Sequence, residues 1–330
     1  MLLSQVLDID GSLCVVAREG SKAAVVLGAV STYGRSAEAL SVGLPLSEVI
    51  AAHGSDEAVD PLALAGQGRL ALPISHPDPA HVHLTDTGLT HLGSAAARDA
   101  IHAKLDGAET LTDSMRMFKM GLEGGCPRAG EIGVQPERFY KGNRHTAVAC
   151  GQPLTSPGFA LDGGEEPEIA GIYLIGADGT PARVGWELAN KFSDHVTERI
   201  NYLYLAHSKL CNASFGPEIL VGDLPSDVRG ISRVWRDGGV VFNAPYLSRE
   251  ANMSHTAPNL EHHHFKYPLF RQPGDLHVHL LSTATLSFAA GMVPHAGAVF
   301  EIEAAAFGLP LRNPLAVAHA TPGAEAVTQL

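Results

Sequence analysis

The sequence predicts an α+β fold that is mostly β, with a small N-terminal α+β domain over residues 1–110 and a larger domain over residues 111–330. A chain of 330 residues is long enough for one large or two ordinary domains. The first third alternates short apolar runs with Ala-rich segments. The remainder consists of short runs of Val, Ile, Leu and aromatic residues separated by Gly and Pro, which is typical of strands and turns.

The N-terminal part combines two kinds of segment. The apolar runs 12–17 and 23–29 are short, as strands are, whereas the Ala-rich segments 36–53 and 95–105 predict helices. Segment 107–128 is expected to connect this part to the rest of the chain.

The C-terminal part is predicted to be mostly β, with strands over 169–175, 230–235, 276–281 and 299–302. One internal helix is expected over 194–207. Ser193 or Asp194 can cap its first turn, and Val196, Ile200 and Leu203 fall on one face.

Charge and composition exclude several classes of protein. Lys and Arg number 23 and Asp and Glu 35, so the formal net charge is −12 and the pI is about 5.7. An acidic chain without a basic stripe is not expected to bind nucleic acid or an anionic membrane. Without a membrane span or signal peptide, and with four scattered cysteines, it is predicted to be cytoplasmic with reduced, buried thiols.

Common nucleotide-binding and hydrolase motifs are absent. The sequence has no G-x-G-x-x-G after a strand, no Walker loop, no G-x-S-x-G elbow and no H-E-x-x-H. The chemistry is therefore expected from polar clusters in the C-terminal part.

The acidic pair Glu166 and Glu168 forms the first cluster. Residues two apart on a strand share one face, and two carboxylates there can bind a hard divalent cation. An acidic turn in front of a strand is the alternative interpretation. Segment 190–195, which ends in Asp194 and His195, is the second cluster, and Lys209 at a helix end the third.

The fourth cluster is rich in histidine. Its members are His255, His262, His263, His264, His277 and His279. His277 and His279 can share a strand face, but no Cys or acidic partner stands at zinc spacing, so buried structural histidines are the favoured interpretation.

Together these clusters resemble the fumarylacetoacetate hydrolase superfamily over 139–317, in order and in spacing. The matching segments are Phe139-Tyr140-Lys141-Gly142, Glu166-Pro167-Glu168, Gly185 with Asn190-Lys191-Phe192-Ser193, Ser208-Lys209 with Gly216-Pro217, Ser282-Thr283 at the family's Gly-Thr, and Leu311-Arg312-Asn313. The residues in these segments most resemble those of the sugar-acid dehydratase branch. Members of that branch convert 2-keto-3-deoxypentonates, derived from L-arabonate or D-xylonate, to 2-oxoglutarate semialdehyde.

The resemblance implies a mixed, mostly β roll as the catalytic domain, with the active site at its open mouth. It also implies Mg²⁺ or Mn²⁺, held by Glu166, Glu168 and a third acid. Lys191 occupies that third position, and an ammonium is not a metal ligand. Either Lys191 swings out and water fills its place, or its ammonium lies between the two glutamates and substitutes for the cation, in which case they keep it charged.

The resemblance also implies roles for residues beyond the metal position. Lys209 and Lys141 would place positive charge beside the keto acid, while Thr283 and Ser208 would contact the substrate. Glu168 would be both a metal ligand and a catalytic residue. His195, His145 and Asp194 are the candidates for the general base, and the two histidines suit that role because an imidazole exchanges protons near neutral pH, whereas Asp194 can equally be a helix cap.

Two alternatives remain open at this point. A C–C hydrolase of acylpyruvates or 2,4-diketo acids would use the same enolate chemistry and would be marked by a His–Glu pair over the site. A catalytically inactive keto-acid-binding protein would explain Lys191. The expected partner in each case is a small 2-keto acid, and the expected assembly is a homodimer.

Overall fold

The computed structural model describes residues 1–92, 113–320, 323–324 and 326–330. The predicted helix 95–105 and the predicted boundary at residues 110 and 111 lie outside the described residues. The helices are α1 (Thr32–Val42), α2 (Leu46–His53), α3 (Pro61–Gly66), α5 (Asp113–Gly124), α6 (His195–Ile200), α7 (Leu205–Lys209) and α8 (Ala257–Phe265).

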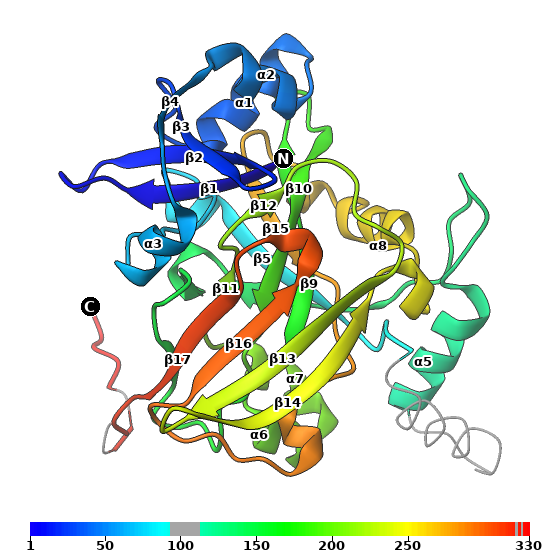
Figure 1. Cartoon of the computed structure of the whole chain (residues 1–330). Helices are drawn as coiled ribbons and strands as arrows, with labels where there is room; N and C mark the ends of the chain where they lie inside the picture. The colour runs from blue at the N-terminus through cyan, green and yellow to red at the C-terminus, as the bar shows by residue number, and fades with distance from the viewer. Residues whose placement is uncertain (93–112, 321–322, 325) are drawn as a thin grey trace.

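Within the described residues the strands form two sheets (Figure 1). The first sheet comprises β1 (Leu2–Leu7), β2 (Leu13–Glu19), β3 (Lys22–Val26), β4 (Ser55–Ala58), β5 (Val82–Gly88), β6 (Glu137–Gly142), β7 (Ala147–Val148), β9 (Pro167–Ile175), β10 (Pro181–Asn190), β11 (Ala213–Phe215), β12 (Ile219–Leu220) and β15 (Leu276–Leu280). The second comprises β8 (Leu154–Ser156), β13 (Val228–Arg236), β14 (Gly239–Ser248), β16 (Val299–Ala304) and β17 (Leu311–Val317).

The first sheet separates two apolar layers. Its main path runs β4-β3-β2-β1-β12-β10-β9-β15-β5-β6. One face packs against α1 and α2, burying side chains such as Leu84 and Ile172. The other face packs against the second sheet and α8, burying Ile169 and Leu188, so adjacent residues of β9 belong to different cores. This alternation explains why the strand 169–175 reads as a continuous apolar run.

Strand β5 joins the N-terminal part of the chain to the centre of this sheet. It runs parallel to β15, with Asp86 opposite Leu280, and antiparallel to β6 on its other side. β15 in turn pairs with β9. A strand from the first 110 residues is therefore inserted between strands of the C-terminal part.

The four predicted C-terminal strands are confirmed as β9, β13, β15 and β16, and the predicted mixed, mostly β fold is confirmed. The single helix predicted over 36–53 is wrong, because the segment forms α1 and α2. Gly43 ends α1 in a left-handed conformation with φ 69°, and Pro45 then precedes α2.

The helix predicted over 194–207 is also interrupted. Asp194 does cap α6, since its carboxylate accepts from the backbone N–H of Thr197, but α6 ends at Ile200 and α7 follows a short 3₁₀ turn. The predicted apolar face is not buried. Ile200 and Leu203 are 63% and 84% exposed.

The four cysteines are free, but of the thiols predicted to be buried only Cys211 is so, whereas Cys14 and Cys150 are half-buried and Cys126 is exposed. Among the described residues, no helix combines the length and apolarity that crossing a bilayer requires.

Candidate active site

Three carboxylates surround the ammonium of Lys191. Its Nζ lies 2.7 Å from Glu166 Oε2, 3.0 Å from Glu168 Oε1 and 3.0 Å from Asp86 Oδ2. All four side chains are buried. We call Asp86, Glu166 and Glu168 the carboxylate cage. The Lys191 side chain therefore occupies the place between the glutamates that the second sequence-based alternative assigns to it.

Sheet register brings these groups together. Glu168 on β9 is opposite Ala189 on β10, and Lys191 follows two residues later on the same face. Asp86 sits at the corresponding end of β5, because β5 and β9 run in opposite directions through β15. The cage thus closes across four neighbouring strands at one end of the sheet.

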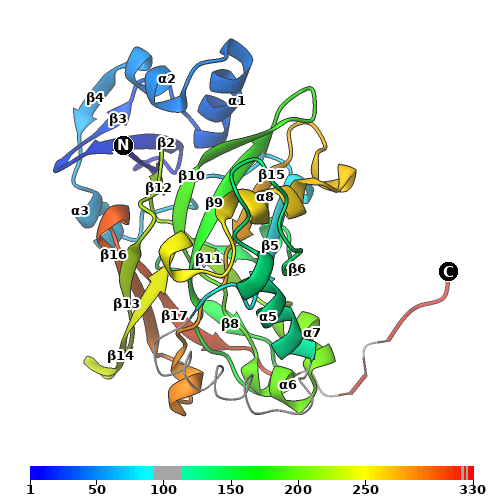
Figure 2. The same ribbon diagram turned by 90° about the vertical axis from the view of Figure 1, so that its right-hand side faces the viewer.

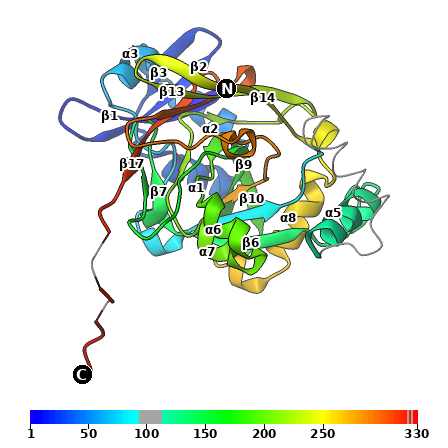
Figure 3. The ribbon, with the colours of Figure 1, turned by 90° about the horizontal axis from the view of Figure 1, so that it is seen from below.

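Lys209 extends the cluster toward solvent. Its Nζ lies 2.8 Å from Glu166 Oε1 and 2.7 Å from Glu198 Oε2, and the Glu198 side chain is 27% exposed. His195 Nε2 lies 3.2 Å from the same Glu166 oxygen. Lys209 and His195 come from α7 and α6, which lie side by side at this end of the molecule, with α7 next to β6 (Figure 3).

Burial and charge act in opposite directions on the cage. Burial alone would raise the pKa of Glu166, but Lys191, Lys209 and His195 outweigh it and hold that pKa well below its usual range. Burial, reinforced by Asp86, raises the pKa of Glu168 well above its usual range. The pKa of Lys191 is well above that of a free lysine because the carboxylates outweigh its burial. Lys191 is consequently an ammonium ion and not an amine nucleophile.

Glu168 is also held by the backbone of the next segment. The N–H of Ser282 donates to Glu168 Oε2 at 2.8 Å. Ser282 has φ 73°, a left-handed conformation that favours glycine, and it stands where the family pattern has Gly. The next residue, Thr283, is half-buried, and its Oγ1 accepts a hydrogen bond from the N–H of Thr285.

Lys141 lies beneath the cluster and does not contact the carboxylates. Its buried Nζ donates to the carbonyls of Phe192 and Lys209, both at 2.9 Å. Burial lowers its pKa. Lys141 therefore fixes the backbone next to Lys191 and at Lys209.

The remaining predicted residues have other contacts. Ser208 is buried and donates its hydroxyl to the carbonyl of Leu205. His145 is exposed in the 3₁₀ turn Arg144–Thr146, and its backbone N–H donates to Asn143. Of the predicted base candidates, only His195 contacts the cage, through the hydrogen bond between its Nε2 and Glu166.

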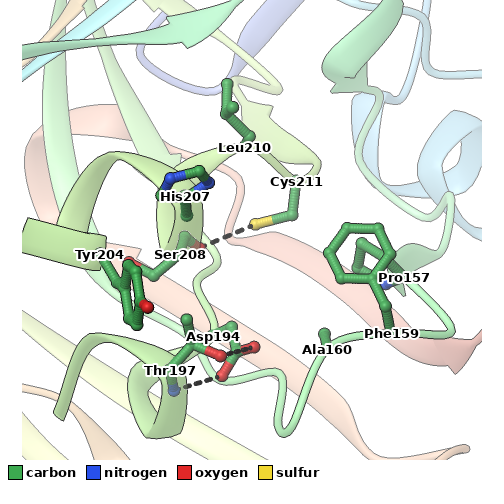
Figure 4. A pocket seen from close by; sticks show the side chains of 10 residues that line it. All are labelled: Pro157, Phe159, Ala160, Asp194, Thr197, Tyr204, His207, Ser208, Leu210 and Cys211. Carbon is green, nitrogen blue, oxygen red and sulfur yellow. Dashed lines mark hydrogen bonds between the residues drawn. The ribbon is translucent and has the colours of Figure 1, made fainter. Parts of the chain in front are cut away.

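A pocket of about 240 Å³ opens beside this cluster. Figure 4 shows its lining, with Asp194 and Thr197 at the bottom of the view, Ser208 and Cys211 above them, and Pro157 and Phe159 to the right. The backbone N–H of Asp194 bonds the carbonyl of Ser208 at 3.0 Å, so the neighbours of His195 and Lys209 form adjoining walls. The cage residues are not part of the lining.

The segment 287–290 covers the cluster from another side. The Ser287 hydroxyl and N–H donate to Glu165 at 2.6 and 2.8 Å, and the ring of Phe288 stacks on His195 with centroids 5.0 Å apart. Glu165, which is not part of the Glu166–Glu168 pair, therefore holds the segment 287–290 in place through Ser287.

The residues present do not fit a divalent metal at the cage. Mg²⁺ would need carboxylate oxygens at about 2.0–2.1 Å around one point. The Lys191 ammonium lies among those oxygens as a hydrogen-bond donor, and a second cation beside it would be repelled. A metal ion therefore has no place in the mechanism considered below.

Sequence reasoning missed two members of the cluster, Asp86 and Glu198. Asp86 belongs to no motif. The only signal is an acid in the middle of the segment VHLTDTG at 82–88, which is unusual for a buried strand. Glu198 looks like an ordinary exposed helix residue.

Comparison with known structures identifies the fold class. No protein-family model and no curated protein sequence matches the chain. Solved structures do, over nearly all of the chain, and they bear out the predicted fumarylacetoacetate-hydrolase-like fold.

Three of these structures illustrate the likeness. A 2-keto-3-deoxyarabinonate dehydratase is 18% identical with a TM-score of 0.71, and a 2-keto-3-deoxy-D-arabinonate dehydratase complexed with magnesium and 2,5-dioxopentanoate is 17% identical with a TM-score of 0.70. In both comparisons 97% of this chain aligns with 100% of the other. A 5-carboxymethyl-2-hydroxymuconate delta-isomerase from Mycobacterium smegmatis is 16% identical with a TM-score of 0.58 over 97% of this chain and 100% of that one.

Proposed function

We propose that this protein is a lyase that dehydrates a 2-keto-3-deoxypentonate to 2-oxoglutarate semialdehyde. The observation that carries the proposal is the buried cluster in which two ammonium groups, Lys191 and Lys209, share Glu166. The fold is that of structures named as 2-keto-3-deoxyarabinonate dehydratases, which supports the substrate class.

The reaction needs a positively charged group beside a 2-keto acid. Loss of a C3 proton produces an enolate, and positive charge next to the C2 oxygen stabilises it. The C4 hydroxyl then leaves with a proton as water. Transfer of a proton from C5 back to C3 produces the enol of the C5 aldehyde, and the net change is the loss of one water.

Lys209 is the group proposed to meet the substrate. Its ammonium is shared between buried Glu166 and partly exposed Glu198. A substrate carboxylate or enolate oxygen can replace Glu198 without leaving a buried charge unpaired. Lys191 cannot do so in this arrangement because its three ion pairs are all with the cage.

Lys191 has a supporting role in this proposal. It neutralises part of the negative charge that Asp86, Glu166 and Glu168 would otherwise present to an anionic substrate. A fixed ammonium thus does the electrostatic part of the work for which related enzymes would use a metal, and the proposed activity is independent of Mg²⁺ or Mn²⁺.

His195 is the proposed general base. Its Nε2 is hydrogen-bonded to Glu166, and Asp162 lies 3.9 Å from its Nδ1, so two carboxylates flank the ring and fix its orientation beside Lys209. The segment carrying Phe288 must move for a substrate to reach this ring, because Phe288 stacks on it.

The test is aldehyde formation from L- and D-2-keto-3-deoxypentonate by the purified protein, with added Mg²⁺ and with EDTA. Turnover that EDTA leaves unchanged is the expected result. Turnover that EDTA abolishes would refute the ammonium role of Lys191, and no turnover of either substrate would refute the dehydratase.

A second candidate function rests on the His195–Glu166 pair. A His–Glu pair beside an enolate-stabilising cation is what a C–C hydrolase of acylpyruvates or 2,4-diketo acids needs to activate water. Pyruvate release from a 2,4-diketo acid, with no aldehyde from the keto-deoxypentonates, would favour this function over the dehydratase.

An inactive keto-acid-binding protein is the third candidate, because Lys191 replaces a ligand. Lys191→Asp distinguishes it. If that variant acquires Mg²⁺-dependent turnover that the natural chain lacks with every substrate tested, the natural site is disabled.

A further inference from the structure

A second cluster of titratable side chains lies on the other face of the first sheet. His83 on β5 is directly opposite His277 on β15, and His279 is opposite Thr85. On β5 the residues His83 and Thr85 alternate with Leu84 and Asp86, which lie on the opposite face of the sheet. There Leu84 belongs to the apolar core and Asp86 to the cage. Helix α8 lies beside β9 and β15 (Figure 2), and its His264 contacts His277 and His279.

Three of these groups can bind one ion. His83 Nε2 lies 3.1 Å from Asp275 Oδ2, and each of His83, Asp275 and His277 offers one ligand atom within 4.8 Å of the other two. Asp275 and His277 are buried, while the His83 side chain is 19% exposed. The cluster is therefore enclosed on the α8 side and reachable past His83.

The ring of His277 carries an unused ligand atom. Its Nε2 is buried without a hydrogen-bond partner, whereas its Nδ1 is 3.0 Å from His264 Nε2. Burial and the neighbouring His83 and His279 lower the pKa of His277 to about 2. The imidazole is thus neutral, and neutral imidazole is the form that binds metals.

We propose that His83, Asp275 and His277 form a binding site for a divalent transition metal of the Zn²⁺ class. Two imidazole nitrogens and one carboxylate oxygen are a common protein ligand set for Zn²⁺, with a water in the fourth position. The hard ion Mg²⁺ prefers oxygen ligands, so this site discriminates against the ion expected of the family.

Groups around the three ligands are arranged to orient them. His81 Nδ1 lies 2.6 Å from Asp275 Oδ1, which leaves Oδ2 for the ion. In the tautomer in which Nδ1 of His277 donates to His264, the partnerless Nε2 of His277 keeps a free lone pair. Hydrogen bonds of this kind fix the orientation of metal ligands.

His279 is not a ligand in this arrangement. Its Nδ1 shares a hydrogen bond with the hydroxyl of Thr85 at 2.8 Å, and its ring stacks on His264 with centroids 4.4 Å apart. The pair His277 and His279, which shares a strand face as the sequence predicts, thus separates into one ligand and one packed ring.

The bound ion would join two distant parts of the chain. His83 comes from the N-terminal third, and Asp275 and His277 come from the C-terminal quarter. Because β5 also carries Asp86, the ion would fasten the strand that completes the carboxylate cage, without taking part in its chemistry.

The test is titration of metal-free, tag-free protein with Co²⁺, followed by its visible absorption, and with Zn²⁺ in competition. The natural chain should bind one Co²⁺ with the absorption of a four-coordinate site, and Zn²⁺ should displace it. His83→Gln and Asp275→Asn should each lose affinity by more than the about 10- to 100-fold typical of losing a group hydrogen-bonded to a ligand. Mg²⁺ in excess should not compete.

His145→Gln, which removes an exposed histidine outside the cluster, is the matched control and should bind Co²⁺ as the natural chain does. Thermal unfolding in EDTA establishes that each variant is folded before titration. Failure of the natural chain to bind Co²⁺, or equal binding by the folded His83→Gln and Asp275→Asn variants, would overturn the proposal. Neither result depends on whether the dehydratase activity exists.

Discussion

Replacing Lys191 by alanine should convert the carboxylate cage from a site filled by the chain's own ammonium into one that needs an external cation. The substitution removes three buried ion-pair contacts of 2.7–3.0 Å and leaves Asp86, Glu166 and Glu168 facing one another. Removing one partner of a buried ion pair costs about 3–5 kcal/mol. We expect a loss of that size in the free energy of unfolding at pH 8.

The loss should depend on pH in a defined direction. Without Lys191 the pKa of Glu166 loses the largest charge that lowers it, and the pKa values of Asp86 and Glu168, which burial already raises, rise further above their unfolded values. A folded state that holds extra protons loses stability as pH rises above the unfolded pKa. The difference between the natural chain and Lys191→Ala should therefore be small near pH 4.5 and grow toward pH 8.

Mg²⁺ should restore the stability of this variant. Three carboxylates around an empty space form a hard-cation site, and an ion at 100 times its dissociation constant stabilises the folded state by about 2.7 kcal/mol. Lys191→Met is the matched variant, since its side chain fills the space while removing the charge. It should be destabilised similarly but should not respond to Mg²⁺.

The measurement is urea unfolding of the natural chain and of both variants at pH 5 and pH 8. Each protein is unfolded in EDTA and in a series of Mg²⁺ concentrations that spans a 100-fold range. The cage interpretation would be refuted if Lys191→Ala were as stable as the natural chain in EDTA at pH 8. Equal stabilisation of the natural chain by Mg²⁺ would refute it too, because the ammonium would then not exclude the ion.

Three further predictions concern single buried groups. Glu168→Gln keeps the shape of the side chain but removes one negative charge next to Lys191, so far-ultraviolet circular dichroism should be unchanged while kcat for aldehyde formation falls by about 10²-fold or more, and near-natural turnover would show that catalysis does not need this carboxylate. Burial raises the pKa of Glu187 well above its usual range, so stability contributed by this group falls as pH rises above about 4.5, by about 1.4 kcal/mol per pH unit until the folded pKa is reached. Glu187→Gln should accordingly be more stable than the natural chain at pH 8 and equal near pH 4.5 in urea unfolding, and a variant less stable at pH 8 would contradict this. Ser287→Ala should cost about 1–3 kcal/mol in the same assay, because one oxygen of buried Glu165 loses its 2.6 Å hydrogen bond, and an unchanged unfolding midpoint would show that this contact contributes nothing.

The glutamate pair could be predicted from sequence because its geometry is local. Residues two apart on a strand share a face, and Glu166 and Glu168 do contact the same ammonium. The resemblance put Lys191 at the third ligand position, but the sequence left open whether its side chain swings out or lies between the two glutamates. Asp86 could not be predicted, since it reaches the site only through the parallel pairing of β5 with β15, and no local pattern encodes that pairing.

The helices show a different limit. A run of Ala-rich sequence predicts helix, but the left-handed Gly43 and the following Pro45 decide that two helices form. For α6 the spacing of Val196, Ile200 and Leu203 describes one helical face, yet the chain turns after Ile200 and leaves that residue exposed. Periodicity measures amphipathicity and does not reveal what the apolar side will contact.

The insertion of β5 between β15 and β6 also determines when this protein can become native during its synthesis. Thr85 and its partner His279 are 194 residues apart in the chain. At about 5–20 residues per second, a ribosome needs about 10–40 s to make that stretch. Until then β5 can pair on one side only, through β6, and its other edge stays open to nonspecific strand pairing. The nascent chain therefore exposes an unpaired strand edge for tens of seconds. We expect its folding yield in cells to respond strongly to the concentration of chaperones and to growth temperature.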